Sequence, residues 1–446
     1  MNPLSSQIAS IVGTSYLIDD LADYPAYAVQ GRIPILVVAP GSVEELAHVV
    51  AAAHAAGMAV IPRGGGTMQA WGRPPAGDFM IVQTTRLSRV RIYEPDDLTI
   101  SVEAGMTMQD LDALLAVHGQ MLPLDVPLPA RSTIGGVLST AMDGPRRLGY
   151  GTSRDLLIGV QVVEATGRSS KAGGMVVKNV SGFDMMKLYT GSLGSLAIIV
   201  SANFKLLPRP RAAATIACTF NTPADAFALV AAIHASQLTP VAVEYLQKDE
   251  GGRMKDEASM SAVISLIPHP SSFILCVRAE GLPAAVERHI RDVAEMAERA
   301  GSSRMSVLRD EDHMAVWAAI NDLPQTFSVA DDELLLRLGC LPSDLERALA
   351  DASALASRQG IALAVAARAL SGIAYLRVRG GDEGLRHQFH ADLLARWPQL
   401  AILAGPPALM AEAPIWGASV PNLALMQRIK QEFDPDNRLN PGRYVV

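Results

Sequence analysis

A chain of 446 residues exceeds the size at which a single hydrophobic core usually keeps growing, so two or more domains are expected. Its 38 Lys and Arg against 45 Asp and Glu give a formal charge of −7, which argues against a general nucleic-acid binder. The three cysteines, Cys218, Cys276 and Cys340, lie far apart, which excludes a disulfide framework and a local CxxC metal or iron–sulfur site.

Strand and helix patterns alternate in the first part of the chain. A helix pattern begins at Ser42, where Glu45 three residues on completes a capping-box spacing, and it ends at Gly57. The N-terminal residues lack the basic flank and continuous apolar core of a signal peptide, and no segment reads as membrane-spanning, so a cytoplasmic protein is expected. The other elements expected here are strands at 33–39, 59–62, 79–83, 90–93 and 98–103, and a helix at 108–118.

Glycine is concentrated between residues 132 and 208, which indicates backbone packed against something flat or charged, with turn chemistry as the alternative. This pattern stops after Pro208-Arg209-Pro210. The polar stretch 247–258 reads as a surface loop, and a helix followed by FDPDNRLNPGRYVV closes the chain. The remaining expected elements are strands at 156–164, 196–207, 214–220, 273–279, 334–339 and 373–378, and helices at 224–235, 283–300 and 343–359.

Three consecutive glycines, Gly64, Gly65 and Gly66, directly follow a predicted strand. Residues without Cβ present successive N–H groups on one concave side, which suits a phosphate or pyrophosphate. Thr67 adds a hydroxyl and Arg63 a charge. The loop is neither a Walker A sequence nor a Rossmann fingerprint, because GxxxxGK[ST] is absent and no helix pattern begins at GGGTMQ. Taken alone, a purely structural turn is equally open.

A second turn of small residues, Ser132-Thr133-Ile134-Gly135-Gly136, leads into a predicted short helix. Backbone N–H groups at the start of a helix attract anions. Two such sites about 70 residues apart would suit a pyrophosphate held between two subdomains.

These motifs, in this order, resemble a known family. The segments VIPRGGGT, VEAGMTMQDLDALLAVHGQMLPLDVP, STIGGVLST, GPRRLGYGTSRDLLIGVQVV, VVKNVSGFDMMKL and FDPDNRLNPGR are similar to those of FAD-linked oxidases of the vanillyl-alcohol oxidase or PCMH type, and within them to FAD-binding subunits of bacterial glycolate oxidase. The resemblance covers about residues 30–210 and 420–446. It implies an α+β fold with a two-subdomain PCMH-type FAD-binding domain (1–210), an α+β cap or substrate domain (211–412), and a C-terminal segment (413–446) that returns to the FAD domain.

The resemblance also implies which residues contact FAD. Relatives that attach FAD covalently carry a His near the glycine loop, and this sequence has Arg63, glycines and Thr67 there, so noncovalent FAD is expected. Met142 and Asp143 depart from the family, which favours Ala and Asn before the glycine. The implied FAD-binding residues are Pro62, Arg63, Gly64, Gly65, Gly66, Thr67, Pro127, Ser132, Thr133, Ile134, Gly135, Gly136, Gly144, Gly151, Gly194, Ile198 and Asn440.

Oxidation of a 2-hydroxy acid requires a group for the carboxylate, a base for the hydroxyl proton and flavin N5 to accept hydride. Arginine suits the carboxylate, because its planar fork bonds two oxygens. Arg337 and Arg377 lie in apolar, strand-like runs of the expected cap domain. Arg337 is the candidate catalytic residue, with an outward-facing structural arginine as the alternative.

The histidine-rich HxGDGNxH stretch of metal-dependent relatives is absent, and no metal is expected. His387 and His390, three residues apart, are expected on a solvated helix face, and His313 on the surface. A further set of charged residues comprises Lys178, Asp184 and Lys187. We expect these residues either to form buried ion pairs near the flavin or to act as catalytic groups.

An FAD scaffold without a recognisable acid–base set fits the FAD-binding subunit of a glycolate oxidase (dehydrogenase) complex. The resemblance implies a homologous flavin subunit that bears the histidines and an iron–sulfur subunit that accepts the electrons. The complex would oxidise a 2-hydroxy acid to a 2-oxo acid, and partners could hold the chain at the inner membrane. The alternatives are a self-sufficient FAD-dependent hydroxy-acid or alcohol dehydrogenase and a non-catalytic FAD-binding scaffold.

Overall fold

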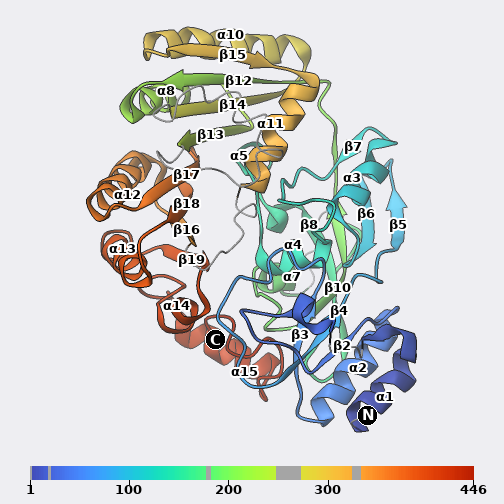
Figure 1. The fold of residues 1–446 in the computed structure, drawn as a ribbon. Coiled ribbons are helices and arrows are strands. Elements are labelled where there is room, and N and C mark those ends of the chain that lie inside the picture. The colour runs from blue at the N-terminus through green and yellow to red at the C-terminus, as the bar shows by residue number, and fades with distance from the viewer. Residues whose placement is uncertain (1–2, 19–21, 177–181, 248–272, 324–332) are drawn as a thin grey trace. The chain divides into compact units, whose positions relative to one another are not determined.

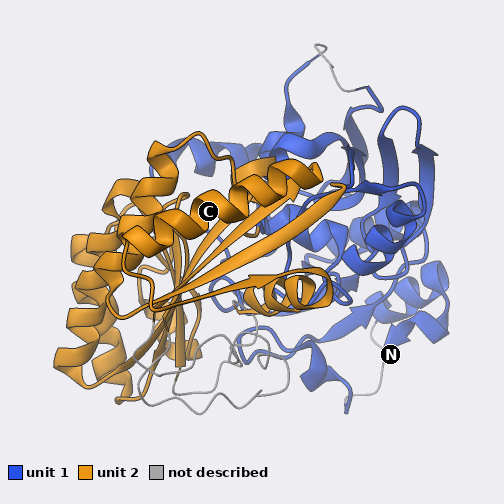
Figure 2. Ribbon diagram, turned by 90° about the horizontal axis from the view of Figure 1, so that it is seen from above, with its two compact units in different colours: residues 1–143, 151–209, 420–446 blue, residues 144–150, 210–419 orange. Residues whose placement is uncertain are grey.

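The computed structural model describes residues 3–18, 22–176, 182–247, 273–323 and 333–446 (Figure 1). The chain forms two compact units, which Figure 2 colours separately. Unit 1 comprises Met1–Asp143, Gly151–Arg209 and Val420–Val446, and unit 2 comprises Gly144–Tyr150 and Pro210–Ser419. The two units differ from the ranges expected from sequence in three places, because residues 144–150, Pro210 and residues 413–419 group with unit 2. The surface loop expected at 247–258 lies outside the described residues except for its first position.

Unit 1 begins with a four-stranded sheet of order β1-β2-β4-β3, in which β2 and β3 run parallel to β4. Ser42 accepts a hydrogen bond from the Glu45 amide at 3.1 Å and starts α2, which confirms the expected helix start. Leu46 and Val50 of α2 pack with Ile8 of α1 and the sheet in one buried cluster. The elements are α1 (Pro3–Val12), η1 (Thr14–Tyr16), β1 (Leu17–Ile18), η2 (Tyr24–Tyr27), β2 (Leu36–Val38), α2 (Val43–Ala55), β3 (Ala59–Arg63) and β4 (Phe79–Gln83).

A second, antiparallel sheet of order β5-β6-β10-β8-β9 follows in unit 1. The two long apolar runs expected as buried strands form β8 and β10, which pair along most of their length. Val160 and Phe204 of these strands pack with Ile134 and Leu138 of α4 in one core. The elements are β5 (Val90–Glu94), β6 (Thr99–Glu103), α3 (Met108–Ala116), β7 (Gln120–Met121), α4 (Ile134–Thr140), α6 (Ser153–Leu156), β8 (Leu157–Val163), β9 (Ser169–Gly173), α7 (Met185–Tyr189), β10 (Ile198–Lys205) and β11 (Leu207–Pro208).

The C-terminal residues complete unit 1. Helix α15 (Leu423–Phe433) places Phe433 edge-on to Tyr189, with ring centroids 6.1 Å apart. The chain then runs beside β3, where Leu439 forms a parallel bridge with Val60. Residues more than 370 positions apart in sequence therefore border the same strand end, and this places Asn440 near the glycine loop.

Unit 2 is built on one eight-stranded antiparallel sheet of order β15-β12-β14-β13-β17-β18-β16-β19. The elements are α5 (Arg147–Tyr150), β12 (Ala212–Phe220), α8 (Pro223–Ala235), β13 (Ala242–Gln247), β14 (Phe273–Gly281), α10 (Pro283–Arg299), β15 (Arg304–Leu308), α11 (Asp310–Asp322), β16 (Glu333–Gly339), η3 (Pro342–Asp344), α12 (Leu345–Gln359), β17 (Ala362–Arg368), β18 (Ile373–Arg379), α13 (Glu383–Arg396), β19 (Leu400–Ala404) and α14 (Pro407–Glu412).

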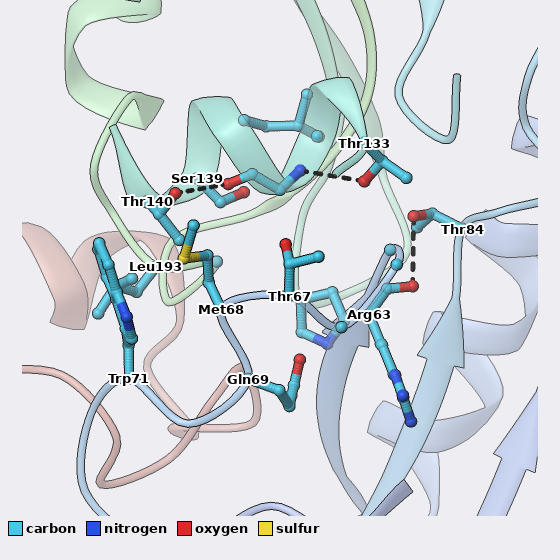
Figure 3. A pocket seen from close by; sticks show the side chains of 18 of the residues that line it. Arg63, Thr67, Met68, Gln69, Trp71, Thr84, Thr133, Ser139, Thr140 and Leu193 are labelled. Carbon is cyan, nitrogen blue, oxygen red and sulfur yellow. Dashed lines mark hydrogen bonds between the residues drawn. The ribbon is translucent and has the colours of Figure 1, made fainter. Parts of the chain in front are cut away.

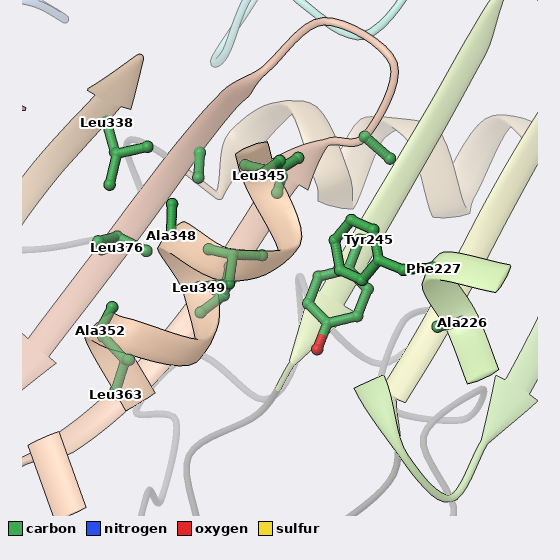
Figure 4. Close-up of a cluster of buried hydrophobic side chains, with 14 of the residues drawn as sticks. Ala226, Phe227, Tyr245, Leu338, Leu345, Ala348, Leu349, Ala352, Leu363 and Leu376 are labelled. Atoms are coloured by element: carbon green, nitrogen blue, oxygen red, sulfur yellow. The ribbon is translucent and has the colours of Figure 1, made fainter. Parts of the chain in front are cut away.

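The two faces of the unit 2 sheet differ in character. Alternate strand residues such as Tyr245, Leu338 and Leu376 pack with helices including α8 and α12 in a large apolar core (Figure 4). On the other face, Trp317 of α11 packs over Ala217 in a smaller cluster. The opposite face also carries charged residues at strand positions 333, 337, 377 and 379.

Two histidines expected at the surface are buried. His313 of α11 is 4% exposed and its Nδ1 lies 2.9 Å from the Thr215 hydroxyl, which also accepts the indole N–H of Trp317 at 2.7 Å. His390 of α13 is 1% exposed, whereas His387 is exposed as expected. The surface expectation was therefore wrong for His313 and His390, because each lies on the face of its helix that packs on the sheet.

Burial lowers the pKa of His390 to about 4 from an ordinary value of 6.5. The folded state therefore binds this proton less readily than the unfolded state, and stability should fall as the pH drops from 6.5 towards 4. We expect this residue to account for about 3 kcal/mol of that loss. Urea unfolding of His390→Gln at pH 7 and pH 4.5 should give a smaller pH difference than wild type. The exposed His48→Gln should leave the difference unchanged.

Candidate functional site

A cavity in unit 1 opens where the glycine loop, helix α4 and the C-terminal segment meet (Figure 3). Its open space is about 770 Å³, part of which is solvent at its mouth. The residues around it are Pro62, Arg63, Gly64, Gly65, Gly66, Thr67, Met68, Gln69, Trp71, Thr84, Thr133, Gly135, Gly136, Ser139, Thr140, Leu193, Gly194, Ile198, Ile199, Asn440 and Arg443. Segments from 62 to 443 in the sequence therefore build one site.

The glycine loop leaves β3 at Arg63 and forms one wall of the cavity. Within the described residues, no hydrogen bond uses the backbone N–H groups of Gly64, Gly65, Gly66 or Thr67. Backbone donors without partners carry a large cost when they are shielded from water. A row of free N–H groups on a concave loop is therefore a site for an anion.

The loop lies too close to its neighbours for ordinary side chains. A Cβ added at Gly65 would lie 1.7 Å from the backbone oxygen of Arg131, and one at Gly64 would lie 2.0 Å from the Thr133 hydroxyl. Contacts this short require glycine at both positions. The same packing brings the loop against the start of α4.

Polar side chains hold the loop from behind. The Thr67 and Ser132 hydroxyls lie 3.1 Å apart, and Ser132 donates to the Pro127 carbonyl at 2.6 Å. Thr133 caps α4 by accepting from the Gly136 amide at 3.4 Å. Ser132 and Pro127 thus support the cavity wall without lining the cavity.

Helix α4 offers fewer free amides than its sequence suggested. The Ile134 amide donates to the Met106 carbonyl at 3.0 Å and the Gly135 amide to the Ala104 carbonyl at 2.7 Å. These bonds tie the helix start to the chain just after β6, so Gly136, whose amide bonds the Thr133 hydroxyl only at 3.4 Å, is the residue of this turn with the most weakly used amide. The glycine loop is therefore the stronger of the two anion sites.

Most of the residues expected around the cofactor do line this cavity, and five do not. Pro127 and Ser132 lie behind it, and Ile134 is buried in the core below α4. Gly144 belongs to unit 2, and Gly151, with φ of +81°, packs against the Asp155 carboxylate. All five positions were expected from the family resemblance, and Ser132 and Ile134 also from the turn of small residues before α4.

The structure adds cavity residues that the sequence did not indicate. Met68, Gln69 and Trp71 follow the glycine loop directly, so their proximity to the motif was a usable signal. Arg443 carried no such signal, because it becomes a cavity residue only when the C-terminal segment returns to β3. The other additional residues are Thr84, Ser139, Thr140, Leu193 and Ile199.

Two arginines supply positive charge to the cavity. Arg63 lies over the Tyr27 ring, 4.6 Å from its centroid, and donates to the Ala26 carbonyl at 2.9 Å. Burial lowers the pKa of Arg63 and lowers that of Arg443 to about 10, so both guanidinium groups stay protonated at neutral pH. Asn440 is 6% exposed and donates from its amide to the Leu193 carbonyl.

The arginines considered for a substrate carboxylate lie on the sheet of unit 2. Arg377 is 6% exposed and forms a bidentate pair with Glu333, with Nη2 to carboxylate distances of 2.9 and 3.0 Å. Arg379 also donates to Glu333, at 2.5 Å. Arg337 is half-buried on β16, opposite Tyr375 and Ala401 of the neighbouring strands, and no ion pair of its side chain occurs among the described residues.

Other charged candidates lie outside the cavity. Asp184 and Lys187 form an ion pair of 2.6 Å with side chains 43% and 53% exposed, so the expectation of a buried pair near the cofactor was wrong. Neither residue borders the cavity, and Lys178 lies outside the described residues. In the parts of the chain that are described, no three His, Cys, Asp or Glu side chains converge as a metal site.

Comparisons with known proteins identify the family. An FAD binding domain profile matches residues 34–173, and the profile of the C-terminal domain of FAD linked oxidases matches residues 209–378 and 418–444. The chain belongs to the FAD-linked oxidases. Its second profile spans two separate stretches, in keeping with a C-terminal segment that leaves unit 2 and ends in unit 1.

Similarity to individual proteins supports the same family assignment for this FAD-linked oxidase. It is 24% identical to glycolate oxidase subunit GlcD of Bacillus subtilis, over 94% of this chain and 91% of that protein. It is 35% identical to glycolate oxidase subunit GlcE of Escherichia coli, over 32% of this chain and 41% of that protein. Among solved structures, p-cresol methylhydroxylase with substrate bound superposes with a TM-score of 0.78 at 14% identity, over 99% of this chain and 96% of that one.

The protein is therefore an FAD-dependent oxidoreductase with an α+β, PCMH-type fold, and FAD is its cofactor. The cavity fits that cofactor. Its glycine loop supplies unpartnered N–H donors, and the Arg63 Nε, Arg443 Nε and Asn440 Oδ1 atoms are buried without partners among the described residues. A dinucleotide with a charged bridge and a polar ring would satisfy such groups. No helix in the described part is long and apolar enough to cross a membrane.

Proposed function

We propose that this oxidoreductase is the FAD-binding subunit of a glycolate oxidase-type complex, which oxidises a 2-hydroxy acid to a 2-oxo acid and passes the electrons to a partner. The observation that carries the proposal is the row of free amides from Gly64 to Thr67 in a cavity of an FAD-linked oxidase. Similarity to two glycolate oxidase subunits supports the substrate class and the assembly. A homologous flavin subunit and an iron–sulfur subunit are the proposed partners.

The glycine loop would hold the FAD pyrophosphate through its N–H groups, with Thr67 and Thr133 beside it. Flavin N5, when bound, accepts hydride from the carbon that bears the hydroxyl. No His, Cys or Tyr occurs among the described residues around the cavity, which supports noncovalent attachment. Acid precipitation of the purified chain should then release all of its flavin into the supernatant. Flavin that stays with the pellet would contradict noncovalent binding.

Arg337 remains our candidate for binding the substrate carboxylate. It is half-buried, whereas Arg377 and Arg379 already pair with Glu333 on the same sheet. A guanidinium without a carboxylate partner is available for one brought by a ligand. Arg337→Met should raise KM for a 2-hydroxy acid in the assembled complex by about tenfold or more, while FAD content stays unchanged.

The visible absorption spectrum of the purified chain tests the proposal most directly. We expect a yellow protein with one FAD per chain, whose flavin is reduced by glycolate under anaerobic conditions in the presence of its partners. Glycolate-dependent dye reduction by the complete complex should disappear when this subunit is omitted. Activity that survives the omission would contradict the proposal.

The same experiment separates the two alternatives. Reduction of flavin by a 2-hydroxy acid in the purified chain alone would support a self-sufficient dehydrogenase. A colourless chain that cannot be reconstituted with FAD, yet binds its partners, would support a scaffold. The free amides of the glycine loop favour the two hypotheses in which the chain binds FAD over the hypothesis that it has lost the cofactor.

A further inference from the structure

Tyr375 of β18 combines a buried ring with an unused hydroxyl. The residue is 5% exposed, and within the described residues its hydroxyl forms no hydrogen bond. The hydroxyl oxygen is also not sealed from solvent. A buried tyrosine normally places its O–H against a partner. A phenol that is packed along its ring and open at its hydroxyl is therefore suited to bond a ligand.

The neighbour of Tyr375 across the sheet is Arg337. Antiparallel pairing of β16 with β18 places the two residues directly opposite each other (Figure 1). Residues in such a pair project from the same face of the sheet, with Cβ atoms about 5 Å apart. The next residues in this row are Ala366 of β17, beside Tyr375, and Ala401 of β19, beside Arg337. Of these four side chains only the phenol and the guanidinium are polar, so a polar ligand would bind to those two.

Four other arginines on this face of the sheet are paired with glutamates. These pairs are Arg278 with Glu280 at 2.6 Å, Arg368 with Glu244 at 4.0 Å, and Arg377 and Arg379 with Glu333 at 2.9 and 2.5 Å. Arg337 has no ion pair in the part of the chain that is described. The guanidinium beside Tyr375 is therefore the one available to a carboxylate that a ligand brings.

Arg368 holds the Tyr375 ring in place. Its guanidinium carbon lies 5.1 Å from the ring centroid, in the arrangement of a cation over an aromatic face. Arg368 is itself 5% exposed, and its Nε lies 4.0 Å from the buried Glu244 carboxylate. The protein therefore fixes the ring before a ligand arrives, and a donor that is already in place loses little freedom on binding.

We propose that Tyr375 contacts the substrate, and that its hydroxyl bonds the oxygen on C2 of an acid whose carboxylate is bound by Arg337. The inference rests on the proposed function, because it concerns the substrate of that reaction. The carboxylate and the C2 oxygen of a 2-hydroxy acid are on adjacent carbons, so the residues that bind them have to be neighbours, as Arg337 and Tyr375 are. Arg368 is the positioning residue for the ring. Tyr375 thereby selects acids with an oxygen at C2 over plain carboxylic acids.

The test compares two ligands of the full chain loaded with oxidised FAD, by isothermal titration. Pyruvate, a 2-oxo acid, carries the C2 oxygen, and propionate lacks it. Tyr375→Phe removes only the hydroxyl, so the Kd of pyruvate should rise about tenfold while that of propionate stays within about threefold of wild type. Arg337→Met removes the group that both carboxylates need, so both Kd values should rise by about tenfold or more.

The matched control is Tyr245→Phe, the same change on the opposite face of the same sheet, where the ring is 1% exposed in the apolar core. It should leave both Kd values unchanged. Equal rises of the two Kd values in Tyr375→Phe, or no rise in either, would overturn the inference. A wild-type chain that binds neither ligand would also overturn it, because the chain would then hold no such subsite.

If Tyr375→Phe does not fold, Arg368→Lys provides the decision, because it keeps the charge opposite Glu244 and loses the planar group that lies over the ring. A rise in the Kd of pyruvate alone supports the inference, and a change shared by both ligands or absent from both overturns it. The proposed function fails by a different result, namely glycolate-dependent dye reduction that persists when this subunit is omitted from the complex. Failure of the two levels is therefore distinguishable.

Discussion

Replacing Gly65 with alanine will reduce FAD affinity by roughly a hundredfold or more. The added methyl group would lie 1.7 Å from the backbone oxygen of Arg131, so the loop or the turn before α4 has to move. Either movement displaces the row of free amides that we assign to the pyrophosphate. Isothermal titration of the apo-protein with FAD, together with the flavin content of the purified variant, measures the effect.

The matched control is Gly174→Ala, another glycine of unit 1, where an added Cβ meets nothing within 4 Å. It should bind FAD like wild type. Equal affinities for Gly65→Ala and wild type would show that the loop is a structural turn, which is the alternative that the sequence left open.

Substituting Lys430 with methionine will destabilise unit 1 by about 3–5 kcal/mol. Its Nζ lies 2.5 Å from Asp434 and donates to the carbonyls of Ser195 and Leu439 at 2.8 and 3.0 Å. The Asp434 side chain is fully buried, so loss of the lysine leaves an uncompensated carboxylate. Urea unfolding at neutral pH measures the change in the free energy of unfolding.

The surface pair between Lys187 and Asp184 provides the comparison, because it joins the same two residue types at 2.6 Å with both side chains about half exposed. Lys187→Met should change stability by less than about 1 kcal/mol. The double change Lys430→Met with Asp434→Asn should recover part of the loss, since the amide can still accept from the Leu439 backbone. A loss in Lys430→Met no larger than that in Lys187→Met would contradict the role of the buried pair.

The sequence predicted those elements whose signals are local. The capping spacing at Ser42 and Glu45 set the start of α2, and the apolar runs around β8 and β10 marked strands that are covered on both faces. Strand β17 was not predicted, because ALAVAAR is rich in alanine and carries no strand-specific pattern. The burial of His313 and His390 was missed because a polar residue on the packed face of a helix looks the same in sequence as one on the solvated face.

For the site as well, the sequence predicted what local signals determine and missed what long-range contacts determine. The glycine loop was found because consecutive glycines have a direct physical meaning, and its amides have no hydrogen-bond partner in the part of the chain that the structure describes. The use of the Gly135 amide by the Ala104 carbonyl could not be foreseen, since it depends on how α4 meets the end of β6. The place of Arg443 beside the cavity could not be found either, because it depends on contacts such as that with Trp71, 372 positions away.

The return of the C-terminal segment to β3 has a consequence for biosynthesis. The wall formed by Asn440 and Arg443 cannot exist until those residues have emerged from the ribosome, long after the glycine loop has been made. We therefore expect cofactor loading to follow translation of the intervening unit.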